Sequence, residues 1–202
     1  MNARDETTVK RYLDVGGGTP TPRPESLRGF QCVSLDIDPT LKPDVLCDAR
    51  EMTTLPAGEY DVVLCSHNLE HFYFHDLPKV LAGILHVLKP DGFAMIAVPS
   101  VFAAMANAFS RGMDLEDVLY QSPVGPIKLV EVIYGARQFI DGSNDFMLHK
   151  NAFSERSLKQ ALQDAGFLFV LAETGPIFQI NAVAFKAASP TPEQVRMFEG
   201  GE

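Results

Sequence analysis

The sequence predicts an α/β fold in which helices cover both faces of a mostly parallel sheet of about seven strands. One reason is that apolar runs of strand length alternate with helical segments along the chain. Another is that glycines interrupt the chain directly after the first apolar run, where the backbone must turn sharply. The last is Gly175-Pro176 between the two final apolar runs, which predicts an antiparallel hairpin.

The strands follow from runs of β-branched and apolar residues that turn residues separate. They are expected at about 11–15, 31–37, 44–47, 61–66, 93–98, 167–173 and 180–187. Between the first two strands, three prolines leave room for only one helical turn near residues 25–28.

Two helices are clear from the sequence. Residues 77–88 carry one apolar stripe, with Asp76 as the expected N-cap and Pro90-Asp91-Gly92 as the turn into the next strand. Residues 155–165 form the other, with Ser154 as N-cap and Gly166 just past the end.

Length and composition indicate one domain over residues 1–202, since a chain of 202 residues buries about 70% of its unfolded surface. Residues 100–150 break the alternation with glycines and prolines, so we interpret them as an insertion that covers the substrate side. The ends, 1–8 and 189–202, are expected to be mobile.

Charge and cysteine content indicate which partners and which cellular location the composition favours. Seventeen basic against 26 acidic residues give a formal charge of −9, which disfavours nucleic acid as a substrate. Cys32, Cys47 and Cys65 have no metal or disulfide spacing, which suits free thiols in the cytoplasm. We find neither a signal peptide nor an integral membrane segment.

The run Tyr12–Gly18 followed by Ser34–Asp38 is the most informative motif. A strand that breaks into glycines, then a second strand that ends on a carboxylate about twenty residues later, predicts a pocket for an adenosine-bearing cofactor. Asp36 is expected to accept the ribose hydroxyls, with Asp38 as the alternative.

The residues after the glycines distinguish between cofactors. Pro20, Pro22 and Pro24 lack the N–H groups that would hold a pyrophosphate, so NAD, FAD and nucleoside triphosphates are disfavoured. S-adenosylmethionine carries no phosphate and is compatible with this loop.

The chain resembles the class I S-adenosylmethionine-dependent methyltransferases, whose fold is Rossmann-like. The resemblance rests on LDVGGG, SLDIDP, DVLCDAREM, YDVVLCSHNLEHF and VLKPDGFAMIAVPS, in family order from residue 12 to 100. YGARQF, FMLHKNAFS and LKQALQDAGF look in addition like a bacterial subgroup of small methyltransferases often linked to glycan synthesis. Pro20 departs from the family pattern, because it stands where the last glycine of the loop would be.

The resemblance implies a set of cofactor contacts and a set of acceptor contacts. The implied S-adenosylmethionine contacts are Asp14, Gly16, Gly17, Gly18, Asp36, Ile37, Asp48, Ala49, Ser66 and His67. For Asp48 the implied partner is the adenine amine, and a solvated turn is the alternative. The residues after the 61–66 strand are implied to face the transferring methyl group.

Histidines are the candidate bases for a hydroxyl acceptor. His71, His67 and His149 are the candidates, with a capping or hydrogen-bonding role as the alternative for His149. His67, His71 and His75 are four residues apart, as in a helical zinc site, but Pro78 and the preceding strand leave no room for a regular helix. We therefore predict no metal.

The sequence thus predicts a methyltransferase that acts on a small polar acceptor, such as a sugar or glycan-related hydroxyl or amine. The alternatives are a cofactor-binding but catalytically weak partner protein and an NAD-dependent enzyme. Tyr120, Tyr134, Arg137, Gln138, Asn144 and His149 supply polar groups for an acceptor. A homodimer is left open as an assembly.

Overall fold

The computed structural model describes residues 9–17, 24–122, 125–140, 145–192 and 194–195. Gly18, Asn144, residues 1–8 and most of the C-terminal tail therefore lie outside the described residues, and so do the predictions made for them. No helix in the described segments is long and apolar enough to cross a membrane.

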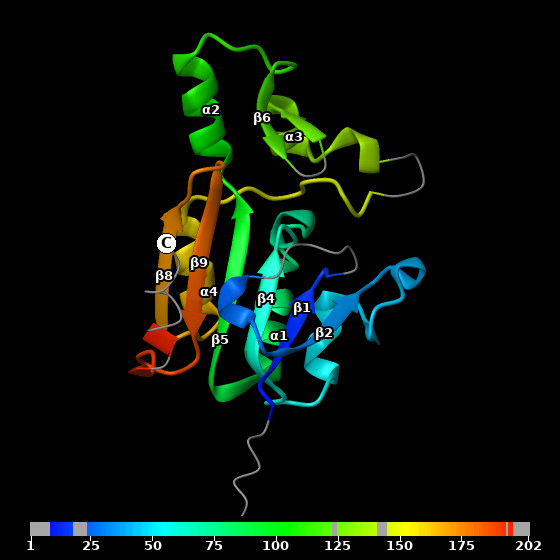
Figure 1. Cartoon of the computed structure of the whole chain (residues 1–202), viewed down its shortest axis with the longest axis vertical. Coiled ribbons are helices and arrows are strands. Elements are labelled where there is room, and N and C mark those ends of the chain that lie inside the picture. The colour runs from blue at the N-terminus through cyan, green and yellow to red at the C-terminus, as the bar shows by residue number, and fades with distance from the viewer. Residues whose placement is uncertain (1–8, 18–23, 123–124, 141–144, 193, 196–202) are drawn as a thin grey trace, which may run out of the picture.

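A seven-stranded sheet with the order β3-β2-β1-β4-β5-β9-β8 forms the centre of the molecule (Figure 1). The first five strands pair in parallel, whereas β9 pairs antiparallel with both β5 and β8. The predicted fold class is confirmed. The strands are β1 Arg11–Val15, β2 Gln31–Asp36, β3 Val45–Leu46, β4 Tyr60–Ser66, β5 Leu88–Pro99, β8 Phe169–Thr174 and β9 Gln179–Phe185.

Strand β5 is longer than predicted, because it begins at Leu88 and includes the expected turn at residues 90–92. Its pairing with β4 jumps from Tyr60–Leu88 to Val62–Phe93, so the turn residues form an irregularity inside the strand.

Between β1 and β9, the described residues form four α-helices and five short 3₁₀ helices that connect and cover the strands. The α-helices are α1 Leu77–Val87, α2 Val101–Ser110, α3 Leu129–Tyr134 and α4 Glu155–Asp164. The 3₁₀ helices are η1 Glu25–Leu27, η2 Pro39–Leu41, η3 Ala49–Thr54, η4 Leu69–His71 and η5 Arg137–Phe139. The single turn predicted near residues 25–28 is η1.

The two faces of the sheet are covered unequally. Side chains of α1, α4 and η3, including Ile84, Leu162 and Met52, pack with one face of the sheet in the main core. The other face carries a smaller cluster around Tyr12 and Phe185, to which η1 contributes Leu27. Within the described residues, the short proline-rich crossover thus replaces a full helix on this face.

The residues predicted as N-caps of α1 and α4 differ in whether their side chains make a capping hydrogen bond. Ser154 Oγ accepts a hydrogen bond from Ser157 N at 3.1 Å, as expected for an N-cap. Asp76 stands at the N-cap of α1, but its carboxylate makes no capping bond. It instead accepts from Lys79 Nζ at 2.8 Å and Arg50 Nη1 at 3.4 Å, so the predicted N-cap position is confirmed but the side chain does not cap the helix.

The segment from residue 100 to 140 forms a small subdomain above the carboxyl ends of β4 and β5 (Figure 1). It contains α2, α3, η5 and a hairpin of β6 Val118–Ser122 and β7 Gly125–Lys128. Its apolar cluster consists of Ala104, Ala108, Leu119, Leu129 and Val132. The sequence predicted an insertion here, but neither the bounds of its two longer helices, α2 and α3, nor the hairpin.

Candidate cofactor and acceptor site

The predicted site residues gather at the carboxyl ends of the central strands. Strand β1 pairs with β2 on one side and β4 on the other, so the strand order reverses at β1. Ligands of open α/β sheets bind at such a switch point. Asp14 in β1, Asp36 at the end of β2 and Ser66 at the end of β4 therefore lie toward the same edge of the sheet.

The glycine turn after β1 leaves no room for side chains. Gly16 has φ +77°, its N–H donates to the Leu35 carbonyl at 2.8 Å, and a Cβ there would lie 2.3 Å from Asn68 Nδ2. A Cβ on Gly17 would lie 2.4 Å from Asp14 Cγ. The backbone thus turns tightly against two polar side chains, Asn68 and Asp14, so both positions require glycine.

The two carboxylates after β2 have different roles. Asp38 Oδ1 accepts from Thr40 N at 2.8 Å and from Thr40 Oγ1 at 2.7 Å, so Asp38 caps η2. Asp36 Oδ1 accepts from Asp38 N at 2.9 Å, which orients the Asp36 carboxylate at the end of the strand. The prediction that Asp36 is the ribose partner stays a prediction. Ile37 beside it is 38% exposed and offers an apolar surface.

Asp48 follows β3, as the sequence predicted, and its carboxylate holds an arginine. It accepts from Arg50 N at 2.9 Å at the start of η3 and forms an ion pair with the Arg50 guanidinium. The hydrogen bond from the Arg50 side chain holds the pKa of Asp48 below its usual value. Ala49 is buried. The predicted contacts of Asp48 and Ala49 with the adenine remain predictions.

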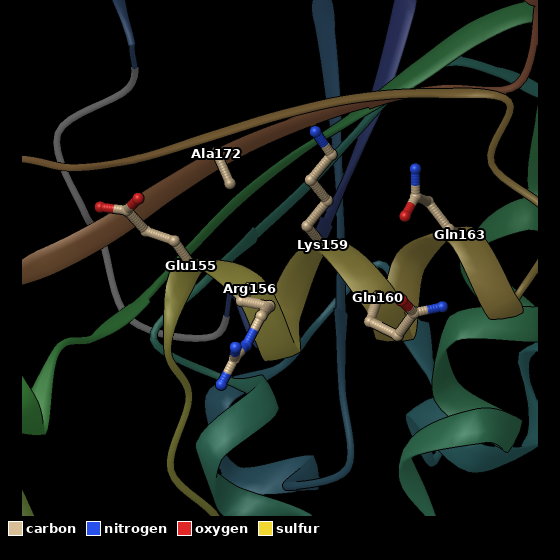
Figure 2. A pocket seen from close by; sticks show the side chains of 6 residues that line it. All are labelled: Glu155, Arg156, Lys159, Gln160, Gln163 and Ala172. Atoms are coloured by element: carbon tan, nitrogen blue, oxygen red, sulfur yellow. The ribbon is translucent and has the colours of Figure 1, made fainter.

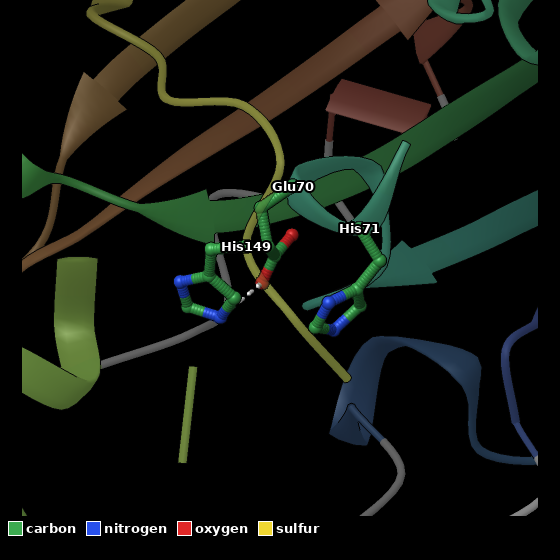
Figure 3. A group of neighbouring side chains, drawn as sticks. All are labelled: Glu70, His71 and His149. Carbon is green, nitrogen blue, oxygen red and sulfur yellow. Dashed lines mark ion pairs between the residues drawn. The ribbon is translucent and has the colours of Figure 1, made fainter. Parts of the chain in front are cut away.

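The turn after β4 brings three histidines around one buried carboxylate. We call His67, Glu70, His71 and His149 the histidine–glutamate cluster; Figure 3 shows three of its members. Glu70 is only 1% exposed and lies 3.5 Å from His67 Nδ1 and 3.9 Å from His149 Nε2. The rings of His71 and His149 lie 5.2 Å apart, centre to centre.

Hydrogen bonds to the main chain hold the cluster in place. Lys150 N and Asn151 N donate to the Glu70 carbonyl at 2.7 and 3.1 Å, which fastens the segment of His149 to the β4 turn. His67 has φ +50°, a strained conformation for a non-glycine residue, and its N–H donates to the Ala97 carbonyl at 2.8 Å. Residues in such conformations concentrate at functional sites.

The charges in the cluster depend on one another. Burial opposes ionisation of Glu70, but the surrounding imidazoles of His67, His71 and His149 hold its pKa below the usual value. Burial also disfavours the imidazolium of His67, yet the neighbouring Glu70 raises the pKa of that ring. For His149, burial dominates and lowers the pKa, so its ring is neutral near pH 7.

The structure unites the three histidines that the sequence selected and adds one residue that it missed. The residue that the sequence analysis did not select is Glu70. Its position between Leu69, which is buried, and His71 was the one sequence feature that could have indicated it. His75 is outside the cluster, because its side chain is 76% exposed and stacks on Tyr73. The helical trio that the sequence analysis rejected is therefore not formed.

A separate hollow of about 350 Å³ lies between α4 and β8 (Figure 2). Its lining consists of Glu155, Arg156, Lys159, Gln160, Gln163 and Ala172. Five of these six residues lie on helix α4, away from the strand ends that carry Asp14 and Asp36. We therefore assign it no part in the candidate site.

Comparisons with known proteins agree with this geometry. A family described as a methyltransferase domain matches residues 2–171. A search of the curated proteins found no match. Since the family match spans most of the chain, the protein belongs to the methyltransferase-domain family.

Solved structures show the same fold at low sequence identity. A SAM-dependent methyltransferase from Archaeoglobus fulgidus is 18% identical, with a TM-score of 0.56 over 88% of this chain and 86% of that one. The Burkholderia thailandensis 1,6-didemethyltoxoflavin-N1-methyltransferase, solved with bound 1,6-didemethyltoxoflavin and S-adenosylhomocysteine, is 18% identical, with a TM-score of 0.51 over 88% and 71%. A protein from Pyrococcus horikoshii OT3 is 13% identical, with a TM-score of 0.53 over 90% and 84%.

The family and the site together define the activity class. The protein is an S-adenosylmethionine-dependent methyltransferase, and S-adenosylmethionine is its cofactor. The predicted recognition is confirmed, and the NAD-dependent alternative is set aside. The contacts of Gly16 and Gly17 with this cofactor remain predictions.

Proposed function

We propose that the enzyme methylates a hydroxyl or amine of a small polar acceptor, of the sugar or glycan-related class. The observation that carries the proposal is the histidine–glutamate cluster, which follows β4 directly and is joined to α3 of the insertion through His149. Nitrogen and oxygen atoms thus gather between the end of β4 and the insertion, where we expect an acceptor to enter.

The residues have separable tasks in this proposal. S-adenosylmethionine supplies a methyl group that its sulfonium has already activated, so the protein chiefly has to orient the acceptor and exclude water. Positioning of this kind lowers barriers by about 7–11 kcal/mol at best. The carboxylates and glycines of β1 and β2 hold the cofactor, the cluster binds the acceptor oxygen or nitrogen, and the insertion covers it.

Several features support a small acceptor. The formal charge of −9 repels phosphate backbones, and the described part of the insertion is a compact unit with a small apolar core. Tyr120 is half-buried in this unit and packs near Phe178. Arg137 is less available to a ligand than the sequence suggested, because its guanidinium pairs with Glu116 at 2.9 Å.

A labelled-methyl transfer screen tests the acceptor class. Nucleotide sugars, free glycosides and small amines should accept label from tritiated S-adenosylmethionine, whereas tRNA and unfolded protein should not. Label that enters only RNA or protein would refute the proposal. Label that enters none of them would favour the catalytically weak partner protein predicted as the alternative.

Two variants test the role of the turn. His67→Ala and His71→Ala are expected to lower turnover far more than they lower affinity for S-adenosylhomocysteine, because both follow β4 on the acceptor side. His75→Ala is the control, since its side chain is exposed and outside the cluster. Equal losses of turnover and cofactor affinity would indicate a structural role instead.

Location and assembly remain predictions. The three cysteines are free thiols, two of them half-buried and Cys65 buried, which supports a cytoplasmic location. Light scattering of the purified protein would test for the homodimer.

A further inference from the structure

We propose that Glu70, His71 and His149 form a binding site for a divalent transition-metal ion. The sequence predicted no metal, because its only spacing suggestive of zinc was the trio with His75. The structure brings together a different set of ligands, and one of them is separated from the others by almost eighty residues. The inference stands on this geometry and does not depend on the identity of the acceptor.

The first observation is that Glu70 is buried without adequate partners. Its side chain is 2% exposed, and within the described residues neither carboxylate oxygen accepts a hydrogen bond. The nearest basic atoms, His67 Nδ1 and His149 Nε2, are 3.5 and 3.9 Å from Oε1. Burying a carboxylate is costly unless it is paired or coordinates a metal, so a cation is the missing partner.

The second observation is the orientation of the imidazoles. His71 Nδ1 lies 3.1 Å from the Leu148 carbonyl, and His149 Nδ1 lies 3.0 Å from the Val132 carbonyl. A carbonyl only accepts, so both Nδ1 atoms carry a proton, and in each neutral ring the Nε2 atom keeps the lone pair that a metal ion needs. Histidines that ligate metals are fixed in this way, with the other ring N–H donated to a main-chain carbonyl.

The third observation is spacing. One ligand atom from each of Glu70, His71 and His149 lies within 4.8 Å of the other two. Ligands at about 2.0–2.2 Å from a tetrahedral ion are roughly 3.4 Å apart, so the widest pair would close by about 1.4 Å, shared between two side chains. Figure 3 shows the Glu70 carboxylate directed between the two rings.

The ligand types indicate the class of ion. Two neutral imidazoles and one carboxylate suit Zn²⁺, Co²⁺ or Fe²⁺, whereas Mg²⁺ and Ca²⁺ prefer oxygen ligands. Three protein ligands leave at least one coordination position for an external ligand, as in catalytic zinc sites. An acceptor oxygen bound there would be polarised for methylation, which gives the cluster a specific role in the proposed reaction.

Cobalt titration of the full-length protein tests the site directly. The protein is used without a polyhistidine tag, which would bind the same ions, and is first stripped with a chelator. We expect one Co²⁺ per chain with visible ligand-field bands, and displacement of the Co²⁺ by Zn²⁺. Absence of saturable binding by the wild type would overturn the proposal.

Variants locate the ion. Glu70→Gln and His149→Gln should each weaken Co²⁺ binding about a hundredfold or more, whereas His75→Gln should leave it unchanged. Affinity for S-adenosylhomocysteine and the circular dichroism spectrum show that each variant is folded, and His149→Gln serves if Glu70→Gln is not. Unchanged Co²⁺ affinity in a folded Glu70→Gln or His149→Gln variant would also overturn the proposal. The partner of the buried Glu70 carboxylate would then be protonated His67, in an ion pair.

The titration also separates this inference from the proposed function. It uses neither cofactor nor acceptor, so it can succeed even when the transfer screen finds no small acceptor. Conversely, methyl transfer to a glycoside that a chelator leaves unaffected, together with no Co²⁺ binding, would refute the metal site and retain the proposed function.

Discussion

At the scale of single residues, the sequence identified those whose role depends on backbone geometry next to a strand. The tight turn at Gly16 and the carboxylate of Asp36 at a strand end could be predicted, because a glycine break after one strand and a carboxylate after the next are typical of a cofactor-binding sheet. The cofactor contacts of Asp14, Gly16 and Asp36 stay predictions. Glu70 could not, because nothing in the sequence indicates that a charged residue in a turn is buried. His149 was selected, but its contact with Glu70 joins segments far apart in the chain, which spacing does not reveal.

Asp36→Ala is expected to weaken S-adenosylhomocysteine binding by roughly ten- to a hundredfold. Charge-assisted hydrogen bonds to the ribose hydroxyls are worth about 1.5–3 kcal/mol, which corresponds to that range. Calorimetry provides the measurement, and Asp38→Ala is the matched control because that carboxylate caps η2. If Asp38→Ala weakened binding and Asp36→Ala did not, the assignment of the ribose partner would be reversed.

Gly17→Ala should lower cofactor affinity at least about tenfold, which is a loss of about 1.4 kcal/mol in binding. The added methyl would lie 2.4 Å from Asp14 Cγ and 2.6 Å from Asp14 Oδ2, so either the turn or the Asp14 side chain must move. Calorimetric titration of S-adenosylhomocysteine measures the effect. An unchanged affinity would show that the turn adjusts without disturbing the cofactor site.

At the scale of elements, helices with a clear apolar stripe and strands with long apolar runs were predicted within a few residues. The N-cap position of Asp76 was predicted, but not that its carboxylate would pair with Lys79 and Arg50 and make no capping bond. Arg50 contacts both Asp48 at the start of η3 and Asp76 at the start of α1. It thereby joins two elements that line the same side of the sheet, a contact that helix-start signals cannot reveal.

Arg50→Met should reduce the free energy of unfolding by about 1 kcal/mol near neutral pH, because the Asp48–Arg50 pair is partly exposed and partly screened. The Arg50 side chain lowers the folded-state pKa of Asp48 below its usual value. Stability from this pair is therefore fully present above the unfolded-state pKa of about 4 and is lost as pH falls through the folded-state pKa.

Urea unfolding of wild type and Arg50→Met at several pH values measures this difference. The two curves should converge under strongly acidic conditions. Arg28→Met is the control, since the Arg28–Glu25 pair is more than 80% exposed at both side chains. A stability difference for Arg50→Met that does not depend on pH would show that packing of the Arg50 stem, rather than its charge, joins η3 to α1.

At the scale of the whole molecule, the protein consists of a sheet domain with a large core and an insertion with a small one. The alternation of strands and helices made the first predictable, because parallel strands and their crossovers follow strict rules. The hairpin and α3 of the insertion are short and rich in glycine and proline at their ends, so local signals there did not distinguish strand, helix and loop. The contact of His149 Nδ1 with the Val132 carbonyl links the insertion to the site.

We expect the insertion to open independently of the sheet domain, which Leu129→Ala tests. Leu129 is 5% exposed in the small cluster, and its truncation would cost about 2–5 kcal/mol if the whole chain unfolded together. When a segment opens by itself, a substitution in it can lower the free energy of global unfolding by no more than the segment's own opening free energy. The melting temperature should therefore change little, while hydrogen exchange becomes faster over the described residues between 101 and 134. Turnover should fall because Val132 no longer positions His149, whereas affinity for S-adenosylhomocysteine should persist.

Leu162→Ala, in the main core, is the contrasting variant: it should lower the melting temperature and speed exchange across the sheet. Uniform exchange changes in both variants would show that the two cores unfold as one unit, and the insertion would then be a rigid wall of the site rather than a movable cover.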